Sequence, residues 1–126
     1  MNTDKDNKRL FINFSNHPSS AWGEQQLQAA NQSGQVVDLP FPQVDPAMTG
    51  EQVQLLAREC VNTILEMGAP SDLTVHVMGE MTVIFHVVTA LKARGVRCVA
   101  STTERMVTEA DGKKITEFHF VQFRKY

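Results

Sequence analysis

Short apolar runs alternate with helix-like segments along most of the chain. The apolar runs cover residues 10–14, 36–39, 73–78 and 96–100. Runs of this length, bounded by polar or glycine-containing breaks, are typical of buried strands. The segments between them repeat apolar residues three and four positions apart, which is the spacing of one helix face. Strands that alternate with helices predict an α/β fold with a parallel sheet.

Capping signals mark where two of the expected helices begin and end. The first is predicted to begin near Ser20 and to end at Gly34, because serine is a common amino-terminal cap and glycine a common stop. The second follows the proline-rich segment 40–46, which cannot pair regularly in a sheet. Thr49 and Gln52 have the spacing of a capping box at its start, and its apolar periodicity continues to residue 68.

The carboxyl-terminal third changes from this alternation to a hairpin pattern. A turn signal at residues 110–113 separates residues 105–108 from the alternating run 115–123. We expect an antiparallel hairpin that extends the sheet. Because crossovers between parallel strands are right-handed, the parallel strands are expected in an order near 2-1-3-4, numbered along the chain.

This strand order predicts a ligand crevice between the first and third strands. Ligands of open α/β sheets bind at the carboxyl ends of the strands, where the strand order reverses. The loop Ser15–Ser20 follows the first strand, and Gly79 and Glu80 follow the third. Each loop joins a strand to a helix, so both are expected to line one small-molecule site.

Several residues in these loops could bind or transform an anionic ligand. A helix start offers free N–H groups and a positive dipole end, which suit a phosphodiester. His17 offers an imidazole in the loop, and an imidazole can exchange a proton with a reacting oxygen. Glu80 can act as a base or accept a ribose hydroxyl. The candidate binding residues are Asn16, Ser19, Ser20, Gly79, Thr102, Thr103 and Arg105.

Structural roles compete with these functional ones. Ser19 and Ser20 can simply cap a helix, and Glu80 can be stabilised by the dipole of the helix that follows it, without any ligand. Arg105 can be a solvated charge at the start of the hairpin. His76 lies inside an apolar run and is interpreted as a hydrogen-bonded core histidine.

We expect neither a bound metal nor a cofactor. His86 and His119 have no partner at metal-ligand spacing, and Cys60 and Cys98 form no CxxC pattern. The two cysteines are interpreted as reduced core thiols, as is usual inside cells.

Composition narrows the class of protein and of partner. The 126 residues, 42% of them hydrophobic, suit one domain over the whole chain. With a formal charge of −2, long nucleic acid is an improbable partner. The chain shows neither a signal peptide nor an apolar run long enough to span a membrane, so a cytoplasmic protein without membrane contact is expected. Residues 1–8 are polar and are expected to be disordered.

The helix predicted over residues 81–94, closed by Gly95, is apolar on nearly all sides. One sheet cannot cover such a helix completely. We therefore expect a homodimer through residues 81–94, which places two crevices side by side.

The two loops also carry a family resemblance. The strings Phe14-Ser15-Asn16-His17-Pro18 and Met78-Gly79-Glu80-Met81-Thr82, with Ser101-Thr102-Thr103-Glu104-Arg105 as a weaker third, resemble the small CRISPR-associated ring nucleases. These are Rossmann-like relatives of the sensor domains that bind cyclic oligoadenylates. The layout of most of the chain is similar, whereas few individual residues match. The proline-rich loop 40–46 and the acidic Glu80 depart from the family pattern.

The resemblance implies a homodimer that binds cyclic tetra-adenylate across its two-fold axis and cleaves it without metal, to switch off antiviral signalling. A ribose 2′-hydroxyl would attack the adjacent phosphorus, so the protein need only align groups and stabilise charge. Ser15, His17 and the helix N–H groups would hold the phosphate, Glu80 or His17 would move the proton, and Arg105 and Thr103 would clamp a neighbouring phosphate. The alternatives are a binding-only sensor or sponge and a structural homodimeric adaptor.

Overall fold

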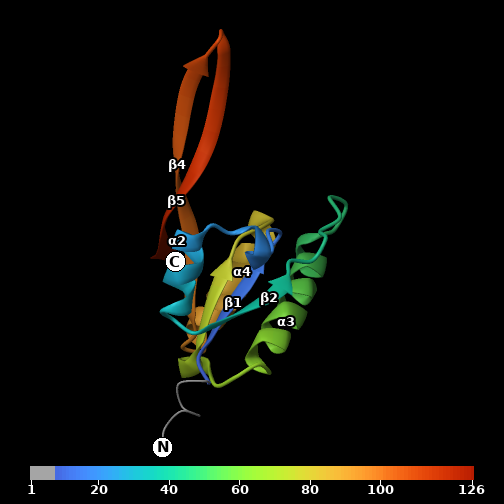
Figure 1. Ribbon diagram of the computed structural model, residues 1–126. Helices are drawn as coiled ribbons and strands as arrows, with labels where there is room; N and C mark the ends of the chain where they lie inside the picture. The colour runs from blue at the N-terminus through green and yellow to red at the C-terminus, as the bar shows by residue number, and fades with distance from the viewer. Residues whose placement is uncertain (1–7) are drawn as a thin grey trace, which may run out of the picture.

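A five-stranded sheet with the order β2-β1-β3-β4-β5 forms the centre of the molecule (Figure 1). The computed structural model describes residues 8–126. The strands are β1 (Leu10–Ser15), β2 (Gln35–Pro40), β3 (Leu73–Val77), β4 (Arg97–Ala110) and β5 (Lys113–Lys125). The first four pair in parallel and β5 pairs antiparallel to β4. The predicted α/β class, strand order and terminal hairpin are confirmed.

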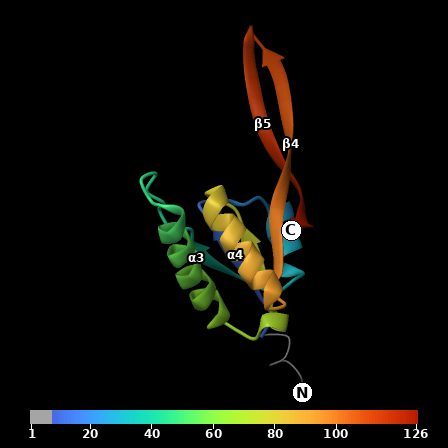
Figure 2. The same ribbon diagram turned by 180° about the vertical axis from the view of Figure 1, so that it is seen from behind.

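Helices cover both faces of the sheet, but unequally. They are α2 (Glu24–Asn31), α3 (Gly50–Leu65) and α4 (Met81–Ala93), with the short 3-10 turns η1 (Ser19–Ala21) and η2 (Pro70–Asp72). Figure 2 shows α3 and α4 side by side on one face, and they pack against each other. The shorter α2 covers part of the other face.

The main hydrophobic core lies between the sheet and the pair α3 and α4. Because side chains alternate across a strand, Ile12 and Phe14 of β1 point to this side, together with Val75 and Val77 of β3. All four are almost fully buried. The predicted capping box of Thr49 and Gln52 is present at the start of α3.

The first helix begins later than predicted. Residues Ser19–Ala21 form only the turn η1, and α2 starts at Glu24 with Gly23 as its amino-terminal cap. Trp22 lies between the two in extended conformation and packs edge-on against Phe11, with 6.1 Å between the ring centres. We attribute the late start to this aromatic contact, because a helix running from Ser20 would have to include Trp22 in helical conformation.

The carboxyl-terminal hairpin is longer than predicted. The expected break between a strand ending at Ala100 and a hairpin starting at Arg105 is absent, because β5 pairs with β4 along its whole length and accommodates only one irregularity, next to Thr102. The hairpin rises far beyond the other elements, at the end of the sheet where β1 and β3 finish (Figures 1 and 2).

The expectation of disorder for residues 1–8 falls almost entirely on residues 1–7, which lie outside the described residues. Within residues 8–126, no helix is both long and apolar enough to cross a membrane.

Candidate functional site

Two adjoining cavities open at the carboxyl ends of β1 and β2, and the larger one extends to Glu80 after β3, where the sequence predicts a crevice. One has a volume of about 640 Å³ and is lined by Asn16, Phe41 and Glu80 among others. The other has a volume of about 300 Å³ and is lined by Asn16, Phe41 and Asp38 among others. The loops after β1 and β3 therefore meet at one site. The position of Gly79 is sterically required, because an added Cβ atom would lie 2.7 Å from the Phe41 ring.

A row of polar side chains crosses the sheet beside these cavities, on the face that α2 covers. The strand register places Asp38, Asn13 and His76 next to one another on β2, β1 and β3. Ser101 extends the row onto β4, two residues beyond Val99, the partner of His76 in the register. We call these four residues the polar row.

Continuous hydrogen bonds join the members of the polar row. The Nδ2 group of Asn13 donates to Asp38 Oδ1 at 3.0 Å and to the carbonyl of His17 at 2.8 Å. On its other side, Asn13 Oδ1 lies 2.9 Å from His76 Nδ1. The Nε2 atom of His76 lies 3.1 Å from Ser101 Oγ. Among the described residues, every buried side-chain nitrogen and oxygen has a hydrogen-bond partner.

His76 is a buried, neutral imidazole. Its ring stacks on Phe11 and meets Trp22 and Phe123 edge-on. Burial lowers the pKa of His76 to about 4, with a smaller contribution from the nearby charge of His17. The interpretation of His76 as a hydrogen-bonded core histidine agrees with this geometry.

The α-helix terminus on which the predicted anion site rested does not begin at Ser20. Ser19 and Ser20 lie in a single turn of 3-10 helix rather than at an α-helix terminus. The N–H and hydroxyl groups of Ser19 instead donate to the carboxylate of Asp38, at 3.1 and 3.0 Å. A carboxylate of the protein thus takes the donors that were expected to hold a phosphate. Ser20 is exposed beside them.

Ser15 is buried and its hydroxyl is engaged within the loop. Ser15 Oγ donates to Asn13 Oδ1 at 2.7 Å and accepts from the N–H of His17 at 3.2 Å. These bonds hold the loop backbone in place. His17 is anchored by the same network through its backbone, whereas its side chain is exposed at the end of the sheet. An exposed imidazole on an anchored backbone is available to a ligand.

Glu80 caps α4, which was the competing structural interpretation. Its carboxylate accepts from the N–H groups of Thr82 and Val83 at 2.9 and 3.0 Å, and from the Thr82 hydroxyl. These bonds, led by the one from the Thr82 hydroxyl, lower the pKa of Glu80. The helix cap engages both carboxylate oxygens, so the geometry disfavours Glu80 as the general base.

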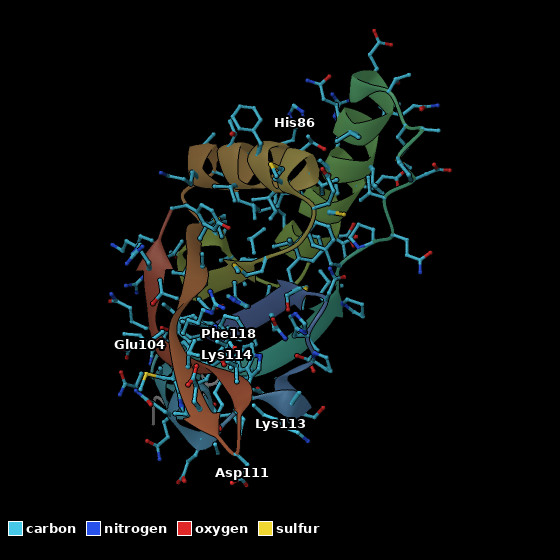
Figure 3. The ribbon with its side chains drawn as sticks, turned by 90° about the horizontal axis from the view of Figure 1, so that it is seen from above. His86, Glu104, Asp111, Lys113, Lys114 and Phe118 are labelled. Carbon is cyan, nitrogen blue, oxygen red and sulfur yellow. The ribbon has the colours of Figure 1, made fainter. Side chains whose placement is uncertain are left out.

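The predicted binding residues on β4 stand on the hairpin rather than inside the cavities. The Thr102 hydroxyl donates to the carbonyl of Gln122 at 3.1 Å. Thr103 and Arg105 are exposed. Because successive side chains of a strand point to opposite faces, these two residues lie on the same face of β4 as Ser101. Looking down the hairpin, Figure 3 shows Glu104 and Phe118 along it and Asp111 at its tip. Arg105 therefore lies on the projecting hairpin, beyond the end of the sheet at which the crevice opens.

Sequence reasoning missed three members of the polar row, namely Asp38, Asn13 and Ser101. A signal existed for two of them, because Asn13 and Asp38 each interrupt an apolar strand run. A polar residue inside a buried strand needs a partner. Ser101 gave no comparable signal, because it does not interrupt an apolar run but is the first residue of the polar segment that follows one. Within residues 8–126, no group of three His, Cys, Asp or Glu side chains is arranged to hold a metal ion.

The fold and the site define a Rossmann-like α/β domain with a crevice at its switch point and a projecting antiparallel hairpin. The chain belongs to the uncharacterized protein MJ1673 family, whose model matches residues 9–124. No curated protein matches the chain.

Proposed function

We propose that the protein is a metal-independent ring nuclease of the cytoplasm that cleaves a cyclic oligoadenylate, with cyclic tetra-adenylate as the expected substrate. The observation that carries the proposal is the crevice at the switch point, lined by Asn16 and flanked by the exposed imidazole of His17. Switch-point crevices of open α/β sheets are the usual place for nucleotide ligands. The family resemblance of the two loops supports the same substrate class.

The proposed reaction is an internal transesterification. The ribose 2′-oxygen forms a bond to the adjacent phosphorus, and the bond from phosphorus to the 5′-oxygen breaks. The 2′-hydroxyl loses its proton to a base, and protonated His17 gives a proton to the departing 5′-oxygen. The product ends in a 2′,3′-cyclic phosphate. The protein contributes alignment and charge stabilisation, which suffice for this chemistry.

The charges around the crevice restrict where a phosphate can bind. Asp38 and Glu80 lie on the cavity side, but each carboxylate is already satisfied by several donors. His17 and Arg105 are the proposed phosphate contacts, with Asn16 and Thr103 as neutral donors beside them. Two positive charges of this kind suit a compact ligand rather than a long phosphate backbone.

We propose that two copies associate through α4. The buried side of this helix holds Val83, Val87 and Leu91, whereas its outer side exposes Met81 and Phe85, which are 78% and 66% accessible. His86 also points away from the sheet (Figure 3). Large exposed apolar side chains on one helix face are typical of an interface. A second copy covering this face would bring two crevices together for one cyclic ligand.

A binding-only sensor or sponge is the second candidate. It is favoured by the engagement of Ser15 and Glu80 in internal hydrogen bonds, which leaves fewer free groups for acid–base chemistry. Such a protein would use the same crevice and the same contacts, and would retain the nucleotide intact.

Incubation of the pure protein with cyclic tetra-adenylate in the presence of a chelator, followed by chromatography, tests these proposals. Turnover to linear or cyclic-phosphate products supports the ring nuclease. Retention of intact nucleotide supports the sponge. Absence of both turnover and binding, for cyclic tetra-adenylate and for cyclic hexa-adenylate, leaves a structural adaptor and overturns the nucleotide proposals.

A further inference from the structure

The polar row has a defined direction of hydrogen bonding. Asp38 Oδ1 and the carbonyl of His17 can only accept, so the amide group of Asn13 that faces them is Nδ2, the donor. The other side of the amide, Oδ1, therefore faces His76 and accepts from its Nδ1–H group. The tautomer of His76 follows from the position of a carboxylate on β2, two strands away.

This tautomer leaves Nε2 of His76 without a proton, because the imidazole is neutral. The neighbouring Ser101 hydroxyl, at 3.1 Å, is then the donor, and Nε2 accepts its proton in a hydrogen bond. A serine hydroxyl bonded to an imidazole that is oriented by a third side chain is the arrangement of an activated nucleophile or proton carrier. Here the third side chain is an amide, held in turn by Asp38.

His76 is too deeply buried to contact a ligand directly, whereas Ser101 is only half-buried. His76 is 3% exposed and surrounded by Phe11, Trp22 and Phe123, so a ligand cannot reach its ring. Ser101 is only half-buried, at the base of the hairpin and on the same face as Thr103 and Arg105. On the His76 side of the row, the Ser101 hydroxyl is the group nearest to solvent, whereas Asp38 at the other end is exposed and lines the smaller cavity.

We propose that Ser101, His76 and Asn13 form a proton relay, in which Ser101 takes the proton of the attacking ribose 2′-hydroxyl. This inference rests on the proposed function. As the 2′-oxygen bonds to phosphorus, its proton passes to Ser101 Oγ, and the hydroxyl proton of Ser101 passes to Nε2 of His76. The resulting imidazolium keeps its Nδ1–H bond to Asn13 Oδ1. Ser101 is the group that contacts the ligand, and His76 and Asn13 act through it.

An activated serine can be detected without any nucleotide. In the reaction with a fluorophosphonate probe, Ser101 Oγ bonds to phosphorus, fluoride leaves, and the serine proton passes to His76. We expect labelling of Ser101, located by mass spectrometry, at a rate at least about 10-fold above that of the exposed Ser71. Thr108→Ala, which removes an exposed hydroxyl farther along the same strand, should leave the labelling rate unchanged, whereas His76→Gln should abolish the advantage. Equal labelling of Ser101 and Ser71 overturns the relay.

Because His76 is buried, His76→Gln can fail to fold, and a second measurement on the wild-type protein decides the same point. Nitrogen-15 NMR of the imidazole distinguishes the two tautomers. The relay requires the proton of His76 on Nδ1, and an Nε2 resonance that shifts in Ser101→Ala. A proton on Nε2 makes Ser101 an acceptor and overturns the proposal.

Turnover separates the relay from the proposed function. With cyclic tetra-adenylate, Ser101→Ala should lower the single-turnover rate by about 100-fold while the Kd stays within a few-fold, and Ser101→Thr should restore part of the rate. Full activity of Ser101→Ala overturns the relay and leaves the ring nuclease standing. If the wild-type protein cleaves no cyclic oligoadenylate, the proposed function fails, and Ser101 is then not the acceptor of a ribose proton, whatever its labelling rate.

Discussion

The two faces of the sheet differ in what they bury. The face covered by α3 and α4 buries aliphatic and aromatic side chains, such as Ile12, Phe14 and Val75. The face covered by α2 buries a smaller apolar cluster around Phe11 and, beside it, Asn13 and His76 of the polar row. Apolar burial stabilises a fold without directional demands, whereas buried polar groups must be satisfied one by one. The first face therefore supplies stability, and the second holds groups in one geometry.

The largest expected loss of stability comes from a charged side chain placed in the apolar core between the sheet and α4. Val87 is fully buried on α4, so Val87→Glu places a carboxylate among apolar side chains and should cost about 4 kcal/mol or more in the free energy of unfolding. Urea denaturation measures it. Phe85→Glu, a matched change on the exposed side of the same helix, should leave the fold intact and reduce the mass seen by light scattering to that of a monomer. A stable Val87→Glu protein would contradict the assigned core, and an unchanged mass for Phe85→Glu would place the interface elsewhere.

The second largest effect concerns the face covered by α2, where the buried His76 should make the free energy of unfolding depend on pH. The pKa of His76 is about 4 in the folded protein against 6.5 for an unperturbed histidine, because burial disfavours the charged ring. As the pH falls from 6.5 to 4, the unfolded chain takes up a proton that the folded chain does not bind. The free energy of unfolding should therefore decrease over this window, by about 3 kcal/mol from this group.

Urea denaturation between pH 7 and pH 4 checks this prediction against His76→Gln. Two ionisable groups lie near His76 in the folded protein. They are His17, whose charge lowers the pKa of His76, and Asp38, which is joined to His76 by hydrogen bonds through Asn13. If the wild-type protein and His76→Gln lose stability in parallel on acidification, the loss belongs to other groups and His76 is not held neutral.

A smaller effect on stability is expected at the crevice end of the sheet, where Gly79 packs against Phe41. Gly79→Ala places a Cβ atom 2.7 Å from the Phe41 ring, and displacing this ring should cost about 1–3 kcal/mol. Gly50→Ala, where the added atom meets nothing within 4 Å, is the control and should be neutral or slightly stabilising. Thermal unfolding of both variants measures the difference. Equal stability of the two would mean that Phe41 does not close the crevice over Gly79.

The smallest effect on stability, with a large effect on activity, is expected for His17. Its side chain is exposed, so His17→Ala should leave the unfolding midpoint unchanged. If His17 gives its proton to the leaving oxygen, the turnover of cyclic tetra-adenylate should decrease by about 100-fold with little change in affinity. Full single-turnover activity of His17→Ala together with inactive Glu80→Gln would move the proton transfer to Glu80, against the assignment of Glu80 as a helix cap.

Local patterns were sufficient for the elements whose signals lie close together in the chain. The capping box of Thr49 and Gln52 and the apolar run of Leu73–Val77 each depend on neighbouring residues, and both are present in the structure. The strand order also followed from sequence, because right-handed crossovers leave few arrangements of alternating strands and helices. The same reasoning placed the crevice at the loops after β1 and β3.

Contacts between distant residues decided the rest. Trp22 meets Phe11 and His76 only after the sheet has formed, and this contact delays the start of α2. Ser19 was predicted to bind an anion, but Asp38, nineteen positions away, takes its donors. The polar row joins residues from four strands. These residues lie far apart along the chain, so no local sequence pattern includes more than one of them. A hydrogen bond depends on distance and direction in space, whereas a hydrophobic pattern is periodic along the chain. Sequence patterns therefore specify the strands and helices, while folding brings Asp38, Asn13, His76 and Ser101 together.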